Sequence, residues 1–462
     1  MERRSVRQAP ETPILAPLAI PKDVDDRRDL KLADVHITHN PRARTNPAIR
    51  ELLLRIEGEY REMPGLSLTM SQAERLWGLD RGTCGFVLTT LIELGVLKQT
   101  RMGHVPSRAG ASHITRRRKF LVKVAINGLG RIGRATLKII MDTPGLDLVA
   151  ANDLGTSDNV VYLLKYDTVY GRYTKAVEST EKGTLTVGEH RLQLLREKDP
   201  SRLPWKSLGV DIVFECTGAF TRREELAAHV RAGARYVIVS APSKGDDVET
   251  IVHGVNTPQG DTAIISCASC TTNCITPVME ILGRRIGVKK AIMTTVHAYT
   301  ASQAIVDSLH THSRRGRSGA ANIVPTSTGA AVATTKALPE YRGRFDGAAL
   351  RVPLPVGSLA DIVALTARPT TVDEVNRVFT EESGSERYRG ILGVTSDPIV
   401  SSDIIKDSRA SVVDLGMTQV VDGDLVKVMS WYDNEWGYSS QLVREASRIA
   451  REIDRPHLEV SR

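Results

Sequence analysis

The sequence has no apolar run near the roughly 18 residues that a membrane-spanning helix needs. Its start, Met-Glu-Arg-Arg, lacks the continuous apolar stretch of a secretory signal. Aromatic residues make up only 5% of the 462 positions, whereas 41% are hydrophobic and 25% are charged, which is typical of globular chains. We therefore expect a cytoplasmic protein without a membrane partner, and this length favours two to four domains.

Cysteine is also scarce, with five residues at positions 84, 216, 267, 270 and 274. An odd count without a secretion signal disfavours a disulfide framework. A zinc site built from Cys267, Cys270 and Cys274 is disfavoured as well, because no second pair or spaced histidines complete a tetrahedral ligand set. We expect no metal, and the cysteines point instead to thiol chemistry.

An excess of positive charge is confined to the front of the chain. The whole sequence holds 62 Lys and Arg against 54 Asp and Glu, a net charge of +8. Residues 1–118 hold 20 and 14 of these, so they carry +6 and leave +2 for the rest. A nearly neutral main body favours small-molecule chemistry, while the basic front leaves a polyanionic partner open.

The front quarter has two predicted parts. Residues 1–46 are rich in Pro, Arg and Asp without a sustained period, which predicts a disordered tail. Residues 47–118 show helical spacing from Pro47, a helix at 83–94 and a hairpin at 96–105 with Gly103 in its turn. Three helices and a hairpin resemble a winged helix-turn-helix, a small mainly α module that ends in a basic linker.

The winged-helix-like module at 47–118 has two interpretations. Duplex binding needs Arg, Lys, Asn or Gln on the recognition helix, and residues 82–90 offer almost none. A small docking or oligomerisation module is therefore slightly favoured, and a nucleic-acid partner stays open.

A dinucleotide-binding pattern opens the main body. The apolar run at 120–126 predicts a buried strand, and it leads through Asn127 into G-x-G-x-x-G at Gly128, Gly130 and Gly133, which opens a helix. A second strand at 146–151 ends at Asp153, twenty residues beyond Gly133. Glycines allow backbone to approach a pyrophosphate, and the carboxylate can accept from ribose hydroxyls while repelling a 2′-phosphate. The pattern predicts a Rossmann-type domain that prefers NAD.

A reactive thiol is predicted at Cys270. Ser269 and the threonines that follow mark a helix start before an apolar run, and partial positive charge there stabilises a thiolate. A thiolate used at neutral pH needs a base or an imidazolium. His297 ends the predicted strand at 291–296, whereas the histidines of the polar stretch 308–318 fit surface groups; spacing alone leaves this choice open.

Five sequence runs together resemble phosphorylating glyceraldehyde-3-phosphate dehydrogenase. They cover the chain from about residue 119 to its end, in that family's order and spacing. The runs are Ala-Ser-Cys-Thr-Thr-Asn at 268–273, His-Ala-Tyr-Thr at 297–300, Pro-Thr-Ser-Thr-Gly-Ala-Ala at 325–331, Leu-Arg-Val-Pro at 350–353 and Trp-Tyr-Asp-Asn-Glu-Trp-Gly-Tyr-Ser at 431–439.

The resemblance implies an α/β protein with a Rossmann-type NAD-binding domain at 119–269 and 435–462 and an α+β catalytic domain at 270–434. It implies a homotetramer and, as catalytic residues, Cys270 as nucleophile and His297 as its activator. The positions that match cofactor-binding residues are Asn127, Gly128, Gly130, Arg131, Ile132, Gly133, Asp153, Thr217, Ser240, Asn434 and Tyr438. The positions that match the site for inorganic phosphate are Ser269, Thr271, Arg317, Thr328 and Gly329, and those that match the site for the substrate's own phosphate are Thr300 and Arg351.

The activity implied is the NAD-dependent oxidation of D-glyceraldehyde 3-phosphate with inorganic phosphate to 1,3-bisphosphoglycerate through a cysteine thioester. Erythrose 4-phosphate is an alternative substrate, because sister enzymes share most of these motifs. A nucleic-acid-binding regulator with a dehydrogenase body as sensor is a second alternative. Ser308 and Leu309 replace a Leu-Pro pair associated with NAD preference, which leaves relaxed cofactor choice open, and the direction of the reaction in the cell also stays open.

Overall fold

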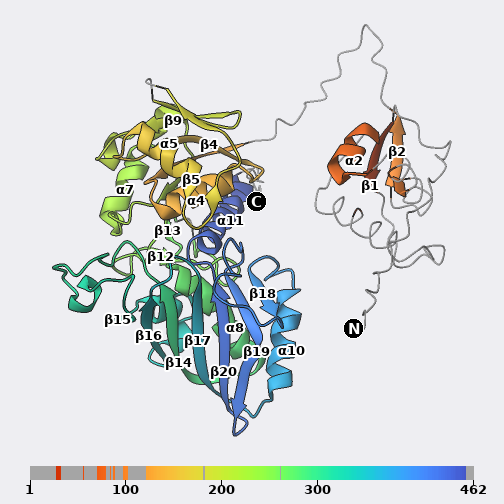
Figure 1. The fold of residues 1–462 in the computed structure, drawn as a ribbon, viewed down its shortest axis with the longest axis vertical. Coiled ribbons are helices and arrows are strands. Elements are labelled where there is room, and N and C mark those ends of the chain that lie inside the picture. The colour runs from red at the N-terminus through yellow and green to blue at the C-terminus, as the bar shows by residue number, and fades with distance from the viewer. Residues whose placement is uncertain are drawn as a thin grey trace, which may run out of the picture. The chain divides into compact units, whose positions relative to one another are not determined.

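The structure is a computed structural model that describes residues 28–32, 56, 70–79, 84, 87–88, 97–101, 121–180, 183–260 and 262–453. The chain divides between Thr115 and Arg116 into two compact units (Figure 1). Each unit is described by itself. No helix among the described residues is both long and apolar enough to cross a membrane.

The first unit pairs two distant segments. Strand β1 (Arg28–Leu32) runs antiparallel to β2 (Leu97–Arg101), and helix α2 (Met70–Trp77) lies between them in sequence. Strand β1 differs from the disordered tail predicted for residues 1–46. It is too short and too polar for a local period to reveal it, and its hydrogen-bonding partner lies about 70 residues away.

Much of the predicted winged-helix module cannot be compared with the structure. Strand β2 begins where the predicted hairpin begins, but Gly103 and the second half of that hairpin lie outside the described residues, as does most of the helix predicted at 83–94. Ala73, Trp77 and Leu88 are buried, which indicates a small core. The module stays a prediction.

The second unit contains a nine-stranded sheet with a mostly parallel centre. The strand order is β12 (Glu249–Thr250), β13 (Ile264–Ser266), β11 (Tyr236–Val239), β10 (Ile212–Glu215), β3 (Val122–Asn127), β4 (Leu146–Asn152), β9 (His190–Leu195), β8 (Thr184–Val187) and β7 (Val177–Ser179). Pairs from β12 to β9 are parallel, and the edge from β9 to β7 is antiparallel. Its helices are α4 (Arg131–Ile140), α5 (Ser157–Lys165), α6 (Trp205–Leu208), α7 (Arg223–Arg231) and α11 (Trp436–Ile453).

The C-terminal helix returns to this sheet. Helix α11 lies against α4, and Leu442, Val443 and Ala446 join one buried cluster with residues of β3 and β4 (Figure 1). Strand β3 is buried on both faces, as a central strand of a parallel sheet must be when helices cover both sides.

A seven-stranded mixed sheet forms the other half of this unit. Its order is β15 (Val324–Ser327), β16 (Phe345–Val352), β14 (Val288–Ala298), β17 (Ser358–Thr366), β20 (Leu425–Tyr432), β19 (Ser411–Val421) and β18 (Leu392–Thr395). Helices α8 (Cys270–Arg285), α9 (Ala330–Ala337) and α10 (Val372–Ser383) contribute to the same buried cluster as its strands. The α/β class with a Rossmann-type domain and an α+β domain is confirmed.

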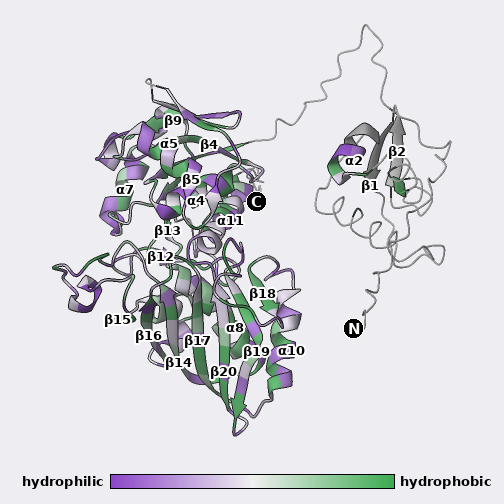
Figure 2. Ribbon diagram, in the orientation of Figure 1, coloured by the Kyte–Doolittle hydropathy of each residue, from purple (hydrophilic) through white to green (hydrophobic). Residues whose placement is uncertain are grey.

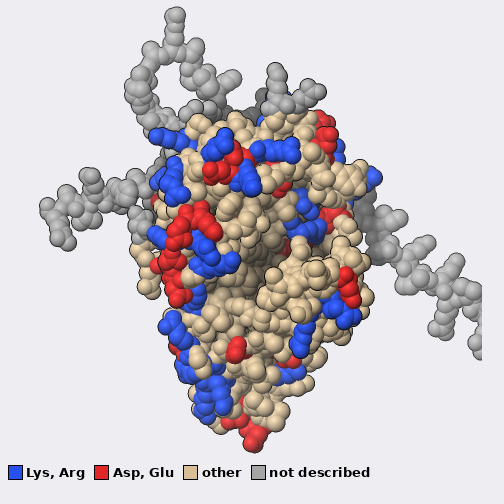
Figure 3. Space-filling model, turned by 90° about the vertical axis from the view of Figure 1, so that its left-hand side faces the viewer, with Lys and Arg blue, Asp and Glu red and all other residues tan. Residues whose placement is uncertain are grey.

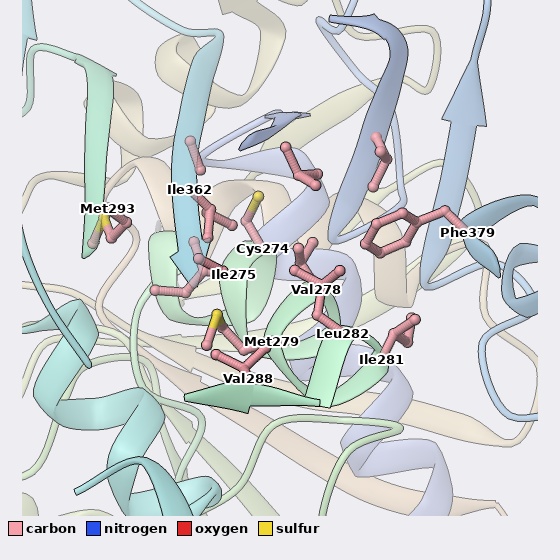
Figure 4. Packing of buried hydrophobic residues seen from close by; sticks show 14 of the residues in the cluster. Cys274, Ile275, Val278, Met279, Ile281, Leu282, Val288, Met293, Ile362 and Phe379 are labelled. Atoms are coloured by element: carbon pink, nitrogen blue, oxygen red, sulfur yellow. The ribbon is translucent and has the colours of Figure 1, made fainter. Parts of the chain in front are cut away.

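Helix α8 lies at the centre of that cluster. Cys274, Val278 and Leu282 of α8 point toward Ile362 of β17 and Phe379 of α10 (Figure 4). Strand β17 alternates strictly between buried and half-buried residues, which is the period of a strand that packs one face on helices. Hydrophobic colour runs along the strands and α8, while α10 alternates between hydrophobic and hydrophilic segments (Figure 2). This core fixes the first turn of α8, where Cys270 lies.

Candidate active site

The glycine turn after β3 requires glycine at two positions. Gly128 has φ of +96°, and a Cβ there would lie 2.7 Å from the backbone nitrogen of Thr217. A Cβ at Gly133 would lie 1.8 Å from the carbonyl oxygen of Gly128. A Cβ at Gly130, the residue that precedes α4, would meet open space. The turn therefore leaves room for a phosphate at the N-terminus of α4.

Asp153 shapes the loop from the end of β4. Its Oδ2 accepts from the backbone N–H of Leu129 at 2.7 Å, and its Oδ1 accepts from that of Gly155 at 2.8 Å. A cavity of about 420 Å³ opens beside it. Its lining residues are Asn127, Gly128, Gly130, Asn152, Asp153, Leu154, Glu197, Lys198, Cys216, Thr217, Ala219 and Phe220. Five of the predicted cofactor residues line this cavity, and its glycines and carboxylate fit the adenosine half of a dinucleotide.

A fully buried carboxylate supports two of these lining residues. Glu215, the last residue of β10, accepts from Asn127 Nδ2 at 2.6 Å, from the backbone N–H of Thr217 at 2.8 Å and from the Thr217 hydroxyl. His229 Nε2 lies 3.0 Å from Glu215 Oε2, and Trp205 Nε1 donates to His229 Nδ1 at 3.0 Å. Because an indole N–H can only donate, Nδ1 is the acceptor and Nε2 carries the proton that goes to Glu215.

The sequence analysis did not find Glu215, His229 or Trp205. A signal was present, because Glu215 ends an apolar strand, where a buried carboxylate requires partners. The partners could not be identified, since His229 lies on α7 and Trp205 begins α6.

The other predicted cofactor residues do not line this cavity. The Arg131 guanidinium binds Glu435 and Asp167, each at 2.5 Å, so its side chain is held by carboxylates rather than offered to a ligand. Tyr438 donates to the carbonyl of Ala268 at 2.9 Å. Ile132 and Ser240 are half-buried, Ser240 directly after β11.

The Asn434 amide uses its oxygen in hydrogen bonds within the described part of the chain, while its Nδ2 is left to donate elsewhere. Its Oδ1 accepts from the backbone N–H of Gly357 and from the hydroxyl of Ser358, both at 3.1 Å. Among the residues that the structure describes, its Nδ2 donates to no protein acceptor. An N–H held in this fixed direction suits a ligand carbonyl such as a carboxamide.

A strained turn presents Cys270. Ala268 has φ of +53°, a left-handed conformation that costs a non-glycine residue of order 1–3 kcal/mol. Asn273 Nδ2 donates to the carbonyls of Cys267 and Ser269, and the Ser269 hydroxyl caps α8 by accepting from the N–H of Thr272 at 3.2 Å. Cys270 is thus the first residue of α8 and is only partly buried.

His297 lies directly beside this thiol. Its Nε2 is 3.3 Å from Cys270 Sγ, and its Nδ1 lies 2.6 Å from the carbonyl oxygen of Ala298. The parallel register of β14 and β16 sets His297 opposite Arg351, whose Nη1 is 2.7 Å from Nδ1 and 3.2 Å from the same carbonyl. The Ala298 carbonyl can only accept and the Arg351 guanidinium can only donate, so the two neighbours of Nδ1 favour opposite tautomers. The tautomer with the proton on Nδ1, donated to Ala298, leaves the Nε2 lone pair facing the sulfur. The edge of the Tyr432 ring contacts the imidazole, with ring centres 5.9 Å apart.

Burial sets the protonation of this pair. It raises the pKa of the Cys270 thiol, against the charge of Arg351 and the hydrogen bonds of Thr271, which act to lower it. It lowers the pKa of His297 to about 3, and the charge of Arg351 adds to this lowering. Burial therefore outweighs the thiolate stabilisation expected at the helix start. Both groups are neutral at pH 7, and in the tautomer with the proton on Nδ1, Nε2 can accept the thiol proton.

The predicted phosphate residues fall into three groups. Ser269, Thr271 and Arg351 surround Cys270, although the Thr271 hydroxyl is buried and bonded to that of Tyr432 at 2.9 Å. Thr328 accepts from the N–H of Ala330 at 3.2 Å, and Gly329 precedes α9, so both mark a helix start. Thr300 Oγ1 lies 2.9 Å from Ser302 Oγ in the loop after β14.

Arg317 is not brought to the thiol. Its Nε donates to Asp307 at 2.8 Å, and its side chain is 63% exposed. Arg315, in the same basic stretch, donates to the Thr326 hydroxyl at 3.0 Å, and its charge helps burial to lower the pKa of Arg351. Arg317 stays a prediction for the inorganic-phosphate site. A loop with cations at 314, 315 and 317 does not show from its sequence which side chain turns toward Arg351, and in the structure it is Arg315.

No group of three or more His, Cys, Asp or Glu side chains that could hold a metal ion occurs in the described part of the chain.

A glycine turn that faces a carboxylate, joined to a thiol–imidazole pair on a second domain, defines a cysteine-dependent, NAD-linked dehydrogenase. Residues 122–223 match the family model of the glyceraldehyde 3-phosphate dehydrogenase NAD binding domain, and residues 269–434 match that of the C-terminal domain. The chain belongs to the glyceraldehyde-3-phosphate dehydrogenase family. The predicted family and NAD as cofactor are confirmed.

Several curated relatives support this family. Glyceraldehyde-3-phosphate dehydrogenase of Zymomonas mobilis is 44% identical over 336 residues, which are 72% of this chain and 99% of the relative. The enzyme of Streptomyces coelicolor is 46% identical over 326 residues, 70% of this chain and 96% of the relative. Glyceraldehyde-3-phosphate dehydrogenase 1 of Bacillus subtilis is 44% identical over 333 residues, 71% of this chain and 98% of the relative.

Proposed function

We propose that this chain oxidises D-glyceraldehyde 3-phosphate with NAD and inorganic phosphate to 1,3-bisphosphoglycerate, through a thioester on Cys270. The observation that carries the proposal is the 3.3 Å contact between Cys270 Sγ and His297 Nε2. The names of the relatives support the aldehyde substrate.

The chain's own residues supply the proton transfers. The Cys270 proton passes to His297 Nε2 as the sulfur adds to the aldehyde carbon, and Nε2 then gives this proton to the former aldehyde oxygen, which completes a hemithioacetal. His297 next holds the proton of the hemithioacetal hydroxyl while the carbon is oxidised to a thioester, and phosphate then displaces the thiolate to give an acyl phosphate. NAD, when bound, supplies the acceptor for the hydride of this oxidation. Positioned base catalysis of this kind is worth roughly 10²- to 10⁴-fold.

The NAD site is proposed from the cavity beside Asp153 and from Asn434. Asp153 would accept from the adenosine ribose, the turn from Gly128 to Gly133 would face the pyrophosphate, and Asn434 Nδ2 would hold the carboxamide. Residues 119–269 and 435–462 are accordingly proposed as the NAD-binding domain, and 270–434 as the catalytic domain. The return of α11 to α4 supports this division.

Two phosphate subsites are proposed around Cys270. Thr300 and Arg351 would bind the substrate's phosphate, and the inorganic phosphate would bind Ser269, Thr271, Thr328 and Gly329, with Arg315 in place of Arg317. A dianion beside Arg351 offsets one of the two causes that lower the pKa of His297. Substrate binding therefore makes His297 a stronger base.

A homotetramer is proposed from apolar surface on the catalytic half. Ile292 on the seven-stranded sheet is 61% exposed, and Ile305 and Val306 in the loop after β14 are 83% and 70% exposed. A cavity of about 810 Å³ includes Ile292, Phe345 and Leu425 in its lining. Exposed apolar patches of this kind mark association surfaces. Light scattering during gel filtration tests it, and a monomeric mass would contradict it.

The face of the second unit that Figure 3 shows gives no support to a nucleic-acid site there. Basic and acidic side chains are interspersed over the face in Figure 3, which is hollowed near its middle. A nucleic-acid partner of residues 47–118 stays a prediction, and a gel shift with the full chain at two salt concentrations tests it.

The decisive assay follows NADH formation with and without inorganic phosphate. Sustained turnover should require phosphate, because only phosphate releases the acyl group as an acyl phosphate. Comparing kcat/KM for glyceraldehyde 3-phosphate and erythrose 4-phosphate separates the two substrates. Phosphate-independent turnover at an equal rate would contradict the proposal.

A further inference from the structure

A second polar cavity lies apart from the residues assigned to catalysis and to NAD. It has a volume of about 340 Å³, at the small end of ligand cavities, which span roughly 300–1,000 Å³. It lies where α4, α11 and two loops meet. Its lining residues are Ile139, Thr143, His253, Ser408, Ser440, Val443, Arg444, Ser447 and Arg451.

Arg444 is a cation in this cavity that has no partner among the residues that the structure describes. Among the described residues it makes no hydrogen bond and no ion pair, and its Nε is buried without an acceptor. Burial lowers its pKa, and no carboxylate opposes this lowering. Arg448, one turn further along α11, is different, because it binds both Glu445 and Glu452.

The Arg444 side chain is half-buried, and its Nε is buried without an acceptor. Such a charge is costly, since neither water nor a counter-charge solvates it fully. The guanidinium of Arg444 also lies against Gly390, where a Cβ would be 2.7 Å from its Nη2. Gly390 has φ of +73° and no side chain, so this close approach is accommodated. The Arg444 guanidinium therefore packs against the backbone at Gly390 and does not extend into solvent.

The other lining groups add donors and no negative charge. Arg451 brings a second cation, and the Ser408 hydroxyl has no hydrogen bond among the described residues. The hydroxyls of Ser440 and Ser447 donate to carbonyls of their own helix at 2.8 Å and are already used. The nearby Glu445 carboxylate is bound by His253 at 2.8 Å and by Arg448 at 2.7 Å, and it is not part of the lining.

We propose that this cavity binds a small anion through a phosphate group, with Arg444 as its main contact and Arg451 as the second cation. Two guanidinium groups match the two charges of a phosphate, and their planar donor pairs suit its oxygens. The ligand is either inorganic phosphate or a phosphate monoester of few carbons. The site is independent of the reaction at Cys270.

Thermal unfolding of the NAD-bound protein with inorganic phosphate or glycerol 2-phosphate tests the proposal. Wild type is compared with Arg444→Met and with Arg377→Met, which removes an exposed arginine of α10 that pairs with Glu381. Phosphate at the active site raises Tm in all three proteins, because a ligand that binds the folded state stabilises it. Of the three proteins, only Arg444→Met should show a smaller increment in Tm on addition of phosphate. In phosphate-free buffer the Tm of Arg444→Met should equal or exceed that of wild type.

The two ligands distinguish the two sources. If the Tm increment is larger in wild type than in Arg444→Met with inorganic phosphate only, the ligand is the free ion. If it is larger with both compounds, the site also accepts the phosphate group of an ester. Equal increments in wild type and Arg444→Met with both compounds would overturn the proposal.

Crystals soaked in selenate give the location directly. The anomalous signal of selenium, in a dianion shaped like phosphate, should appear beside Arg444 in wild type and disappear in Arg444→Met. Signal at the active site serves as the internal control. An occupied active site with no signal at Arg444 in wild type would contradict the proposal.

Discussion

Two buried histidines of this chain have opposite surroundings. His229 is 0% exposed and lies between the Trp205 indole and the Glu215 carboxylate, so both ring nitrogens have fixed partners. His297 is 3% exposed and lies between a guanidinium and a partly exposed thiol. Burial alone therefore does not mark a catalytic histidine. A nitrogen that faces a reactive group accessible to a ligand marks it.

The largest effect on activity is expected at Cys270, the thiol that His297 faces. Cys270→Ala removes the atom that forms the thioester, so NADH formation should fall by at least about 10⁴-fold. NAD should still bind, since Cys270 does not line the cavity beside Asp153, and fluorescence titration checks this. Retained phosphate-dependent NADH formation would show that another residue is the nucleophile.

Removing the base should cost less than removing the nucleophile. His297→Asn keeps a polar side chain but loses the proton acceptor, and kcat should fall roughly 10²- to 10⁴-fold. The KM for NAD should stay within about twofold. Steady-state kinetics measures both constants, and a variant with a raised KM and unchanged kcat would assign His297 to binding instead.

Substitution of His229 should affect the KM for NAD more than kcat, the reverse of the result expected for His297. His229→Leu removes one of the donors to the buried Glu215 carboxylate and leaves the Trp205 indole N–H without an acceptor. A buried polar group left unpaired costs about 1–3 kcal/mol. Asn127 and Thr217 would lose their fixed support, so the KM for NAD should rise while kcat at saturating NAD changes little. Trp205→Phe, a milder control, removes one hydrogen bond and should show a smaller rise. A fall in kcat equal to that of His297→Asn would remove the distinction between the two histidines.

Substitution of Arg351 tests the low pKa of His297 through the pH dependence of kcat. Its charge helps to lower the pKa of His297 to about 3, so Arg351→Gln should raise that pKa toward its ordinary value of roughly 6.5. Activity needs neutral His297 and is lost as pH falls through its pKa. The acid limb of kcat should therefore move to higher pH in the variant. An unmoved limb would show that Arg351 does not act on His297.

A last test concerns stability in acid. Folded His297 resists protonation down to about pH 3, whereas the unfolded side chain takes up a proton near pH 6.5. Below pH 6.5 the unfolded state binds more protons than the folded state. The free energy of unfolding therefore decreases as the pH is lowered from about 6.5 to about 3. His297→Asn should show a shallower fall in urea midpoint over this window. Parallel curves for both proteins would contradict the low pKa.

The sequence was informative where function depends on local pattern. The glycine turn, Asp153 and the start of α8 follow from spacing along one segment, and the family motif placed His297. Residues whose roles depend on packing were not accessible. The supports of Glu215 come from α6 and α7, β1 pairs with a strand about 70 residues away, and only the folded loop shows that Arg315 rather than Arg317 turns inward. The raised pKa of Cys270 likewise needs the burial that tertiary structure supplies.

The most direct test of the central claim is a rapid-mixing measurement of NADH with aldehyde and NAD in the absence of phosphate. The account predicts a burst that approaches one NADH per chain, with the acyl group trapped on Cys270, and a burst slowed roughly 10²-fold or more in His297→Asn. A wild-type time course without a burst, or a burst of equal rate in His297→Asn, would contradict it.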